Sequence, residues 1–406
     1  MKRYDLITPE GTGDLLFEEC ALRRSLEEKL SESFKRRGYC EIITPGLEFF
    51  DIFNLNSRYF PQESMYKLVD NKGRLLVVRP DSTLPIARVA ATRLRDAELP
   101  LRLYYRQNVY RSTTGMRGRS SEIHQMGIEL IGSDSRRADL EVITGAIEVL
   151  AMLENGDFRF EIGDIGFFRE LVSKLNASDD DKETVRSLIE VKNYPALNDL
   201  LDSIGRNEIT EALKQLPRLF GGEEVFDKAS KLFKDEKTDR IIADLRDIYN
   251  KLSSLGYDGK ITVDLGIVNK LDYYTGVVMK GYLQGYGSAV LSGGRYNKLL
   301  AEFGYDVPAT GFAVNVDAAA KVLRRTHSYS APVPDIIVYG DDGYEMAAVN
   351  YAGKLRKSGL TAENSVFGTY EETVEYAERK GIAKAVRVGK DIVTENIKAG
   401  GVRNGK

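Results

Sequence analysis

The sequence predicts an α+β fold: helices flank an antiparallel sheet, a helical insertion interrupts it, and a small α/β domain follows at the C-terminus. Three observations support this prediction. Strand-like runs at 101–110 and 122–131 enclose a polar loop that contains glycine, which is typical of an antiparallel hairpin. Apolar residues at helical spacing, broken by turn residues, fill 166–256. Beyond residue 335, strand and helix patterns alternate as in a separate domain.

Length and composition describe an ordinary globular chain. The 406 residues exceed one compact core, and 42% hydrophobic with 29% charged residues supply both an interior and a polar surface. We expect a core domain in two parts, separated by the helical insertion, and then the small α/β domain, with bounds at 1–165, 166–256, 257–328 and 333–406. The net charge of −3 argues against nucleic acid as the main partner.

Several other classes of protein are excluded by composition. Cys20 and Cys40 are too few for a disulfide framework or a metal cluster, and the N-terminus lacks the apolar core of a signal peptide. No apolar run is long enough to cross a bilayer, so we expect a cytoplasmic protein with no membrane partner. The only histidines are His124, which we interpret as a packed strand residue, and His327. We therefore predict no metal site and no cofactor.

Local patterns place the elements before the hairpin. In chain order they predict helix 17–37, strand 39–45, strand 74–79 and helix 84–95. Asp81, Ser82 and Thr83 stand between the last two of these and supply capping residues. A strand end that opens onto a helix start is a common pocket wall.

The same patterns continue after the hairpin. They predict helix 138–152, strands 158–165, 261–265, 275–282 and 288–291, and a helix opened by 293–300. Past a proline-containing linker at 328–334, they predict strand 335–339, helix 344–357, strand 360–364, helix 370–380 and strand 384–388.

Three polar residues of the hairpin are candidates for ligand binding. Arg111 ends one strand beside the strand that carries Gln125 and Glu129, and alternate positions of a strand share a face. If that face lines a cavity, Arg111 can bind a carboxylate while Gln125 and Glu129 bind N–H groups. The alternative is an ion-pair ladder across the hairpin surface.

The segment 271–276 offers two adjacent tyrosines. On a short strand, Tyr273 and Tyr274 would point to opposite faces, so one could pack in the core while the other reaches a ligand. The alternative is that both are core residues.

Common one-motif enzymes are excluded, since the chain lacks a P-loop, a His-Glu-x-x-His helix and a Gly-x-Ser-x-Gly elbow. The glycines at 285, 287, 293 and 294 lack the context of a dinucleotide-binding turn and are better explained by hairpin turns and close backbone approach. The arginines of loop 111–119 either clamp phosphates or are solvated.

Several motifs in register resemble those of the class II histidyl-tRNA synthetases, across almost the whole chain. The N-terminal signature is similar to 9–15, class II motif 1 to 39–48, motif 2 to 101–132, and the two histidine-specific motifs to 271–274 and 293–296. This resemblance implies the class II synthetase fold, and it implies that 333–406 is a reduced anticodon-binding domain.

The resemblance also implies a histidine site. By position, its residues are Asp81, Thr83, Arg111, Gln125, Glu129, Tyr273 and Tyr274. Arg111 would meet the carboxylate of histidine, Asp81, Thr83 and Gln125 its ammonium group, and Glu129 and Tyr274 its imidazole. Asp81 stands where the family has a longer glutamate.

Departures from the synthetases fall on the nucleotide side. Asn269 and Lys270 stand where the family has an arginine and a glycine, Thr113 replaces the glutamate that holds adenine, and Ala318 replaces the motif 3 arginine. Adenylation needs fixed cations against the developing phosphoryl charge, so we predict no catalytic residues and no catalytic activity for the chain alone.

This combination resembles the regulatory subunit of ATP phosphoribosyltransferase, a paralogue of the synthetases. The resemblance implies an allosteric role in histidine biosynthesis: a hetero-oligomer with a short catalytic subunit, feedback inhibition by L-histidine, and self-association through the motif 1 region. Two alternatives remain open. One is a divergent synthetase that uses Lys270, Arg117 or Arg119 as its cations, and the other is a histidine-sensing or tRNA-binding paralogue.

Overall fold

The computed structural model describes residues 3–54, 61–112, 120–153, 157–268, 273–326 and 332–397. Its chain forms two compact units, Met1–Ser328 and Tyr329–Lys406, and each is described by itself. None of the described helices is both long and apolar enough to cross a membrane.

A nine-stranded sheet is the framework of the first unit. Its order is β1 (Cys40–Glu41), β5 (Leu101–Tyr110), β6 (Glu122–Ile131), β12 (Ala309–Asn315), β11 (Leu291–Arg295), β10 (Val277–Leu283), β7 (Phe158–Asp164), β9 (Ile261–Asp264) and β8 (Phe220–Gly221). Neighbouring strands are antiparallel except for the pairs β1 with β5 and β7 with β9. The predicted antiparallel sheet is confirmed, and the hairpin strands β5 and β6 have the predicted bounds.

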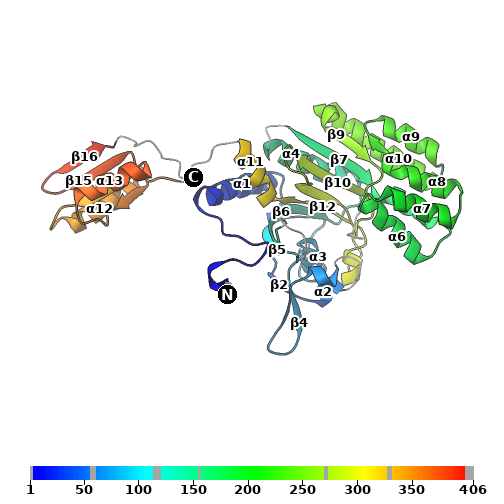
Figure 1. Cartoon of the computed structure of the whole chain (residues 1–406), viewed down its shortest axis with the longest axis horizontal. Coiled ribbons are helices and arrows are strands. Elements are labelled where there is room, and N and C mark those ends of the chain that lie inside the picture. Colours follow the sequence, from blue (N-terminus) through cyan, green and yellow to red (C-terminus); the bar gives the residue numbers. More distant parts are fainter. Residues whose placement is uncertain are drawn as a thin grey trace. The chain divides into compact units, whose positions relative to one another are not determined.

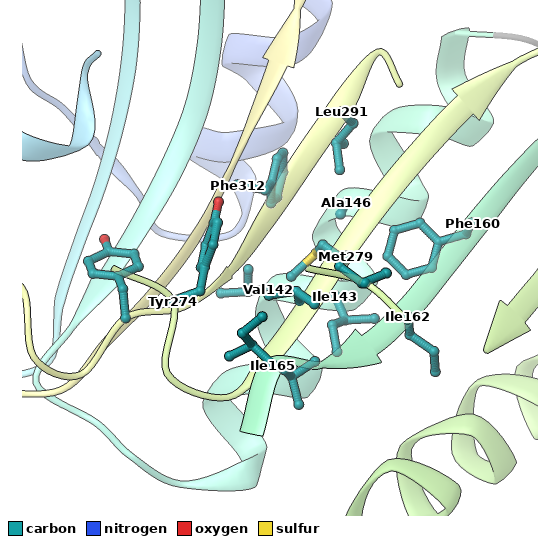
Figure 2. Packing of buried hydrophobic residues seen from close by; sticks show 14 of the residues in the cluster. Val142, Ile143, Ala146, Phe160, Ile162, Ile165, Tyr274, Met279, Leu291 and Phe312 are labelled. Atoms are coloured by element: carbon teal, nitrogen blue, oxygen red, sulfur yellow. The ribbon is translucent and has the colours of Figure 1, made fainter. Parts of the chain in front are cut away.

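The helices that pack on the sheet include α1 (Phe17–Arg36), α4 (Arg136–Leu153) and α11 (Val316–Thr326) (Figure 1). The predicted stripe of α1 is confirmed, because Leu22, Leu26, Leu30 and Phe34 are all nearly inaccessible. Figure 2 shows the core under α4, whose Val142, Ile143 and Ala146 lie against Phe160, Ile162 and Met279 of the sheet.

Register decides which hairpin residues face away from these helices. Gln107 pairs with Gln125 and Tyr104 with Ile128, so alternate residues of both strands share a face. Tyr104 meets the ring of Phe34 in α1 at 5.9 Å, which places the even-numbered face toward the helices. Gln125 and Glu129 therefore look out from the opposite face.

A three-stranded sheet lies before the hairpin. It consists of β2 (Leu47–Phe49), β4 (Leu75–Val78) and β3 (Lys67–Val69), in that order, with α2 (Asp51–Asn54) and α3 (Thr83–Thr92) beside it. The sequence patterns identified β4 and α3 but missed the three-residue strands β2 and β3, which are too short to show alternation.

The segment between β7 and β9 is helical, as predicted. It contains α5 (Ile165–Ser173), α6 (Asp179–Glu190), α7 (Tyr194–Ile204), α8 (Glu208–Gln215), α9 (Glu224–Leu232) and α10 (Glu236–Leu252). Side chains cap five of these helices at Asp164, Ser178, Asn193, Asn207 and Asp235, each accepting a backbone N–H of the first turn. The strand β8 within this segment joins the edge of the main sheet.

The second unit is a four-stranded sheet in the order β14 (Ala362–Asn364), β13 (Ile336–Gly340), β15 (Lys384–Val388) and β16 (Ile392–Asn396). Two separate apolar clusters form on it: α12 (Glu345–Lys357) contributes to one and α13 (Tyr370–Lys380) to the other. The alternation of strands and helices matches the sequence pattern. The antiparallel strand β16 was not predicted, because all its residues are exposed and it shows no alternation of buried and exposed positions.

Two predictions around the glycine motif are wrong: the strand expected at 288–291 lies instead at Leu291–Arg295 (β11), and the helix expected from 293 does not form. The run 293–300 does not open a helix, because Gly293 and Gly294 lie within β11 and only a short 3₁₀ turn follows at Leu300–Phe303. These glycines are needed inside the strand, since a side chain at Gly294 would collide with the backbone of Val277 and the ring of Tyr274. Strand β12 was not predicted at all.

Candidate functional site

All seven residues of the predicted histidine set line one small cavity on the outward face of the hairpin. Its volume is about 70 Å³, and its walls are Asp81, Thr83, Arg111, Gln125, Glu129, Tyr273, Tyr274, Ser292, Tyr296, Gly311, Phe312 and Ala313. We call it the central cavity. The chain thus brings together the turn from β4 into α3, the hairpin, the tyrosines before β10, and residues of β11 and β12.

Glu129 is the most enclosed acid of the central cavity, with 2% of its surface exposed. Its Oε1 accepts the hydroxyl proton of Thr83 at 2.8 Å, and its Oε2 accepts that of Tyr296. Burial raises the pKa of this carboxyl to about 8, although both hydroxyls favour the charged form. At neutral pH Glu129 is therefore mostly protonated.

Gly311 on the neighbouring strand β12 makes room for this carboxyl. It pairs directly with Glu129, and a side chain at Gly311 would overlap Oε2. Any larger residue there would displace either the strand or the acid.

Asp81 lies at the start of α3 and is 5% exposed. Its Oδ1 accepts the backbone N–H of Leu84 at 3.0 Å, so the carboxylate caps the helix. Ser82, the residue before the first helical position, makes no capping bond. Burial raises the pKa of Asp81, and the positive charge of Arg111 opposes that rise.

Arg111 is held just beyond the end of β5. Its backbone N–H donates to Ser121 O at 2.8 Å, and its Nε donates to the carbonyl oxygen of Pro80 at 2.8 Å. The guanidinium is thus anchored beside Asp81, so the cavity carries one fixed cation next to one buried acid.

The two adjacent tyrosines correct the sequence interpretation. Tyr273 and Tyr274 precede β10 rather than lying on a strand, so they do not alternate, and both line the cavity. Their ring centroids are 4.7 Å apart, and the ring of Tyr296 meets Tyr273 edge-on at 5.9 Å. Burial raises the pKa of the Tyr274 hydroxyl, which therefore stays protonated as a donor.

Sequence reasoning missed five wall residues: Ser292, Tyr296, Gly311, Phe312 and Ala313. Tyr296 had a signal, since it ends the Gly-Gly-Arg-Tyr run, but no role was inferred for it. The others depend on β11 and β12 lying next to the hairpin, and pairing between strands so distant in sequence has no local mark.

Of the residues that differ from the synthetases on the nucleotide side, the structure describes only Ala318. Ala318 lies in the first turn of α11 as a buried side chain, 1% exposed, and its N–H donates to Asn315 Oδ1 at 2.9 Å. Thr113, Arg117, Arg119, Asn269 and Lys270 lie outside the described residues. Among the described residues, no group of three or more His, Cys, Asp or Glu side chains could hold a metal ion.

Comparison with known proteins yields one family model, described as histidyl-tRNA synthetase, which matches residues 11–319. The chain is 40% identical over 405 residues to a protein of Clostridium acetobutylicum named ATP phosphoribosyltransferase regulatory subunit, covering 98% of both chains. A protein of the same name from Bacillus mycoides is 38% identical over 405 residues, with 98% of this chain and 95% of the relative covered.

Solved structures agree with these relatives. A structure from Bacillus halodurans C, titled as an ATP phosphoribosyltransferase regulatory subunit/histidyl-tRNA synthetase, matches with a TM-score of 0.81 at 30% identity, covering 92% of this chain and 97% of that one. A histidyl-tRNA synthetase from Nostoc sp. PCC 7120 has the same fold, with a TM-score of 0.77 at 21% identity and 97% of both chains covered. The chain belongs to the family of ATP phosphoribosyltransferase regulatory subunits, which have the fold of histidyl-tRNA synthetase.

Proposed function

We propose that this protein is the non-catalytic regulatory subunit of ATP phosphoribosyltransferase. It works with a short catalytic subunit in the first step of histidine biosynthesis and makes that step sensitive to L-histidine. The relatives' names support the role in the complex. The observation that carries the histidine part is the convergence of seven family-matched residues on the central cavity.

Each part of a histidine molecule has a partner of suitable chemistry in the cavity. The guanidinium of Arg111 receives the carboxylate, and Asp81, Thr83 and Gln125 receive the ammonium group. Because one oxygen of Asp81 caps α3, the ammonium group binds its other oxygen. Glu129 and Tyr274 then hold the imidazole.

The absence of adenylation activity is part of the proposal. Stabilising the transferred phosphoryl charge requires fixed cations, and removing one such group costs about 2.7–4 kcal/mol of transition-state stabilisation. A buried methyl group at Ala318 cannot supply that charge. We expect no histidine-dependent pyrophosphate exchange, and measurable exchange would instead favour a divergent synthetase.

Self-association through the motif 1 region completes the proposal. Ile43 is 77% exposed, and Leu47, Phe49 and Leu68 are exposed on one face of the three-stranded sheet, where Phe49 and Leu68 both pair with Leu76. Exposed apolar side chains on one face of a sheet are typical of an interface. Both cysteines are free and exposed, as suits a reducing compartment, and we place the complex in the cytoplasm.

Histidine binding is tested by calorimetry on Glu129→Gln. We expect affinity to fall by about 1–3 kcal/mol, because the amide replaces a buried group that hydrogen-bonds at both oxygens. Glu161→Gln is the matched control: Glu161 is also a strand glutamate, and it accepts the hydroxyl of Tyr282 at 2.8 Å outside the cavity. Equal affinity in Glu129→Gln and wild type would place histidine elsewhere.

The regulatory role is tested by mixing the chain with a short catalytic subunit. We expect phosphoribosyl transfer to rise on mixing and to fall when L-histidine is added, with Glu129→Gln requiring more histidine for the same inhibition. A catalytic subunit whose turnover ignores this chain would contradict the proposal.

A further inference from the structure

A second, larger pocket lies on the helix-covered face of the sheet, on the other side of β6 from the central cavity. Its volume is about 440 Å³, within the range of about 300–1,000 Å³ that small-molecule sites occupy. Four elements form it: the segment Gly11–Leu15, the first turns of α1, the start of β6 and one face of α11. We call it the strap pocket, after the segment that closes it.

The strap Gly11–Leu15 is attached to the sheet at Gly11. The carbonyl oxygen of Gly11 accepts the backbone N–H groups of Ser121 at 2.7 Å and Glu122 at 3.3 Å. Gly11 has a φ of +78°, and any side chain there would overlap Ser121 Oγ, so glycine is required at this crossing.

The two helical walls are also fixed to each other. Arg324 of α11 is paired with Glu19 of α1, and Arg23 of α1 lies 3.6 Å from Asp317 of α11. The pocket is therefore formed without a ligand.

Most charges of the strap pocket are already matched by protein groups. Asp317 accepts the backbone N–H of His124 at 2.7 Å, in addition to its contact with Arg23. Glu122 accepts from Asn108 Nδ2 at 2.5 Å and from the Tyr110 hydroxyl at 2.9 Å. Together with the pair of Glu19 and Arg324, these contacts satisfy three acids.

The remaining acid and base of the walls are Asp14 and Lys321, and neither forms an ion pair with a described residue. Lys321 projects from the pocket face of α11, four residues after Asp317 and one after Ala320. Leu15, Leu22 and Ala320 add apolar surface between the charged groups.

We propose that the strap pocket binds a second small molecule, a zwitterion with an apolar body such as an amino acid. Lys321 receives its carboxylate and Asp14 its ammonium group, while Leu15, Leu22 and Ala320 contact its side chain. A simple anion fits less well, because the walls carry four acids against three bases: Asp14, Glu19, Glu122 and Asp317 against Arg23, Lys321 and Arg324. This site does not depend on histidine occupying the central cavity.

Thermal unfolding of the full chain tests the site, with each of the twenty common amino acids and inorganic phosphate as separate probes. Glu129→Gln serves as the background, because it weakens the central cavity. We expect at least one amino acid at saturating concentration to raise the unfolding midpoint of this background by about 2 °C or more.

Two further substitutions, each added to the Glu129→Gln background, should abolish that rise in the unfolding midpoint. Lys321→Gln removes the cation, and Gly13→Trp fills the pocket from its rim, where a side chain at Gly13 would meet nothing within 4 Å and needs no left-handed backbone. Lys354→Gln, at an exposed lysine of the second unit, should leave the shift intact.

Three results would overturn the proposal. In the first, no amino acid raises the unfolding midpoint of the Glu129→Gln protein. In the second, the rise survives both Lys321→Gln and Gly13→Trp. In the third, inorganic phosphate raises the midpoint equally and Lys321→Gln abolishes that rise. The last would identify the ligand as a simple anion.

Discussion

At the scale of single residues, the central cavity depends on an acid that burial keeps largely neutral. Glu129 is reached by two hydroxyl donors and stands beside the buried Asp81, so a second full charge there would be poorly solvated. A neutral carboxylic acid can donate a hydrogen bond as well as accept one. The cavity can therefore satisfy either nitrogen of an imidazole ring.

Glu129 should make stability depend on pH in a defined direction. Its folded pKa of about 8 lies above the value of 4.5 for an unperturbed glutamate, so the folded state holds the extra proton. The protonated Glu129 contributes fully to the free energy of unfolding below pH 4.5. This contribution is lost as pH rises toward 8, at up to about 1.4 kcal/mol per pH unit.

Denaturant unfolding of ligand-free protein at several pH values checks this expectation. The difference in unfolding free energy between wild type and Glu129→Gln should fall across that window. Asp164 and Asp264, whose pKa values burial also raises, are present in both proteins and cancel. A pH-independent difference would show that Glu129 is charged in the folded state.

The sequence predicted those cavity residues whose positions depend on the β5–β6 hairpin alone. The pairing of β5 with β6 follows from one hairpin, and it puts Gln125 and Glu129 on the face that Arg111 borders. Tyr296 and Gly311 reach the same place only through β11 and β12, and nothing in their neighbouring residues indicates that contact.

At the scale of elements, the three-stranded sheet β2–β4–β3 leaves apolar side chains of β2 exposed. One residue of β2, Glu48, is buried and paired with Arg88 of α3 at 2.7 Å, while Leu47 and Phe49 on either side of it are exposed. The face of the sheet that carries Glu48 and Val77 is thus held to the core, and the face that carries Leu47 and Phe49 is turned outward.

Self-association should fail when a charge enters that apolar side. We expect Ile43→Asp to weaken the dimer at least about tenfold, because an unpaired charge buried in an interface costs more than about 1.4 kcal/mol. Sedimentation equilibrium measures the change. Val366→Asp, at an 89% exposed position of the second unit, is the control and should leave the dimer intact. A wild-type chain that is monomeric would refute the interface.

Long elements with strong periodicity were predictable and short ones were not. Helix α1 and strands β5, β6 and β15 have the expected bounds to within a residue, since each carries a full pattern of burial. Strands β2, β3 and β8 are two or three residues long and owe their existence to partners elsewhere in the chain.

At the scale of the whole molecule, the order of the nine strands could not be derived from sequence. β12 is the last strand of the main sheet in chain order, yet it lies directly beside β6 and forms the wall next to Glu129. The likeness to a known family, carried by motifs in register, supplied what local patterns could not.

The two ends of the main sheet have a consequence for how the molecule can assemble. Both terminal strands, Cys40–Glu41 and Phe220–Gly221, are two residues long. A strand so short exposes few unsatisfied N–H and C=O groups, so it is a poor template for the addition of a foreign strand. Addition of a foreign strand to either end of the main sheet is thereby disfavoured.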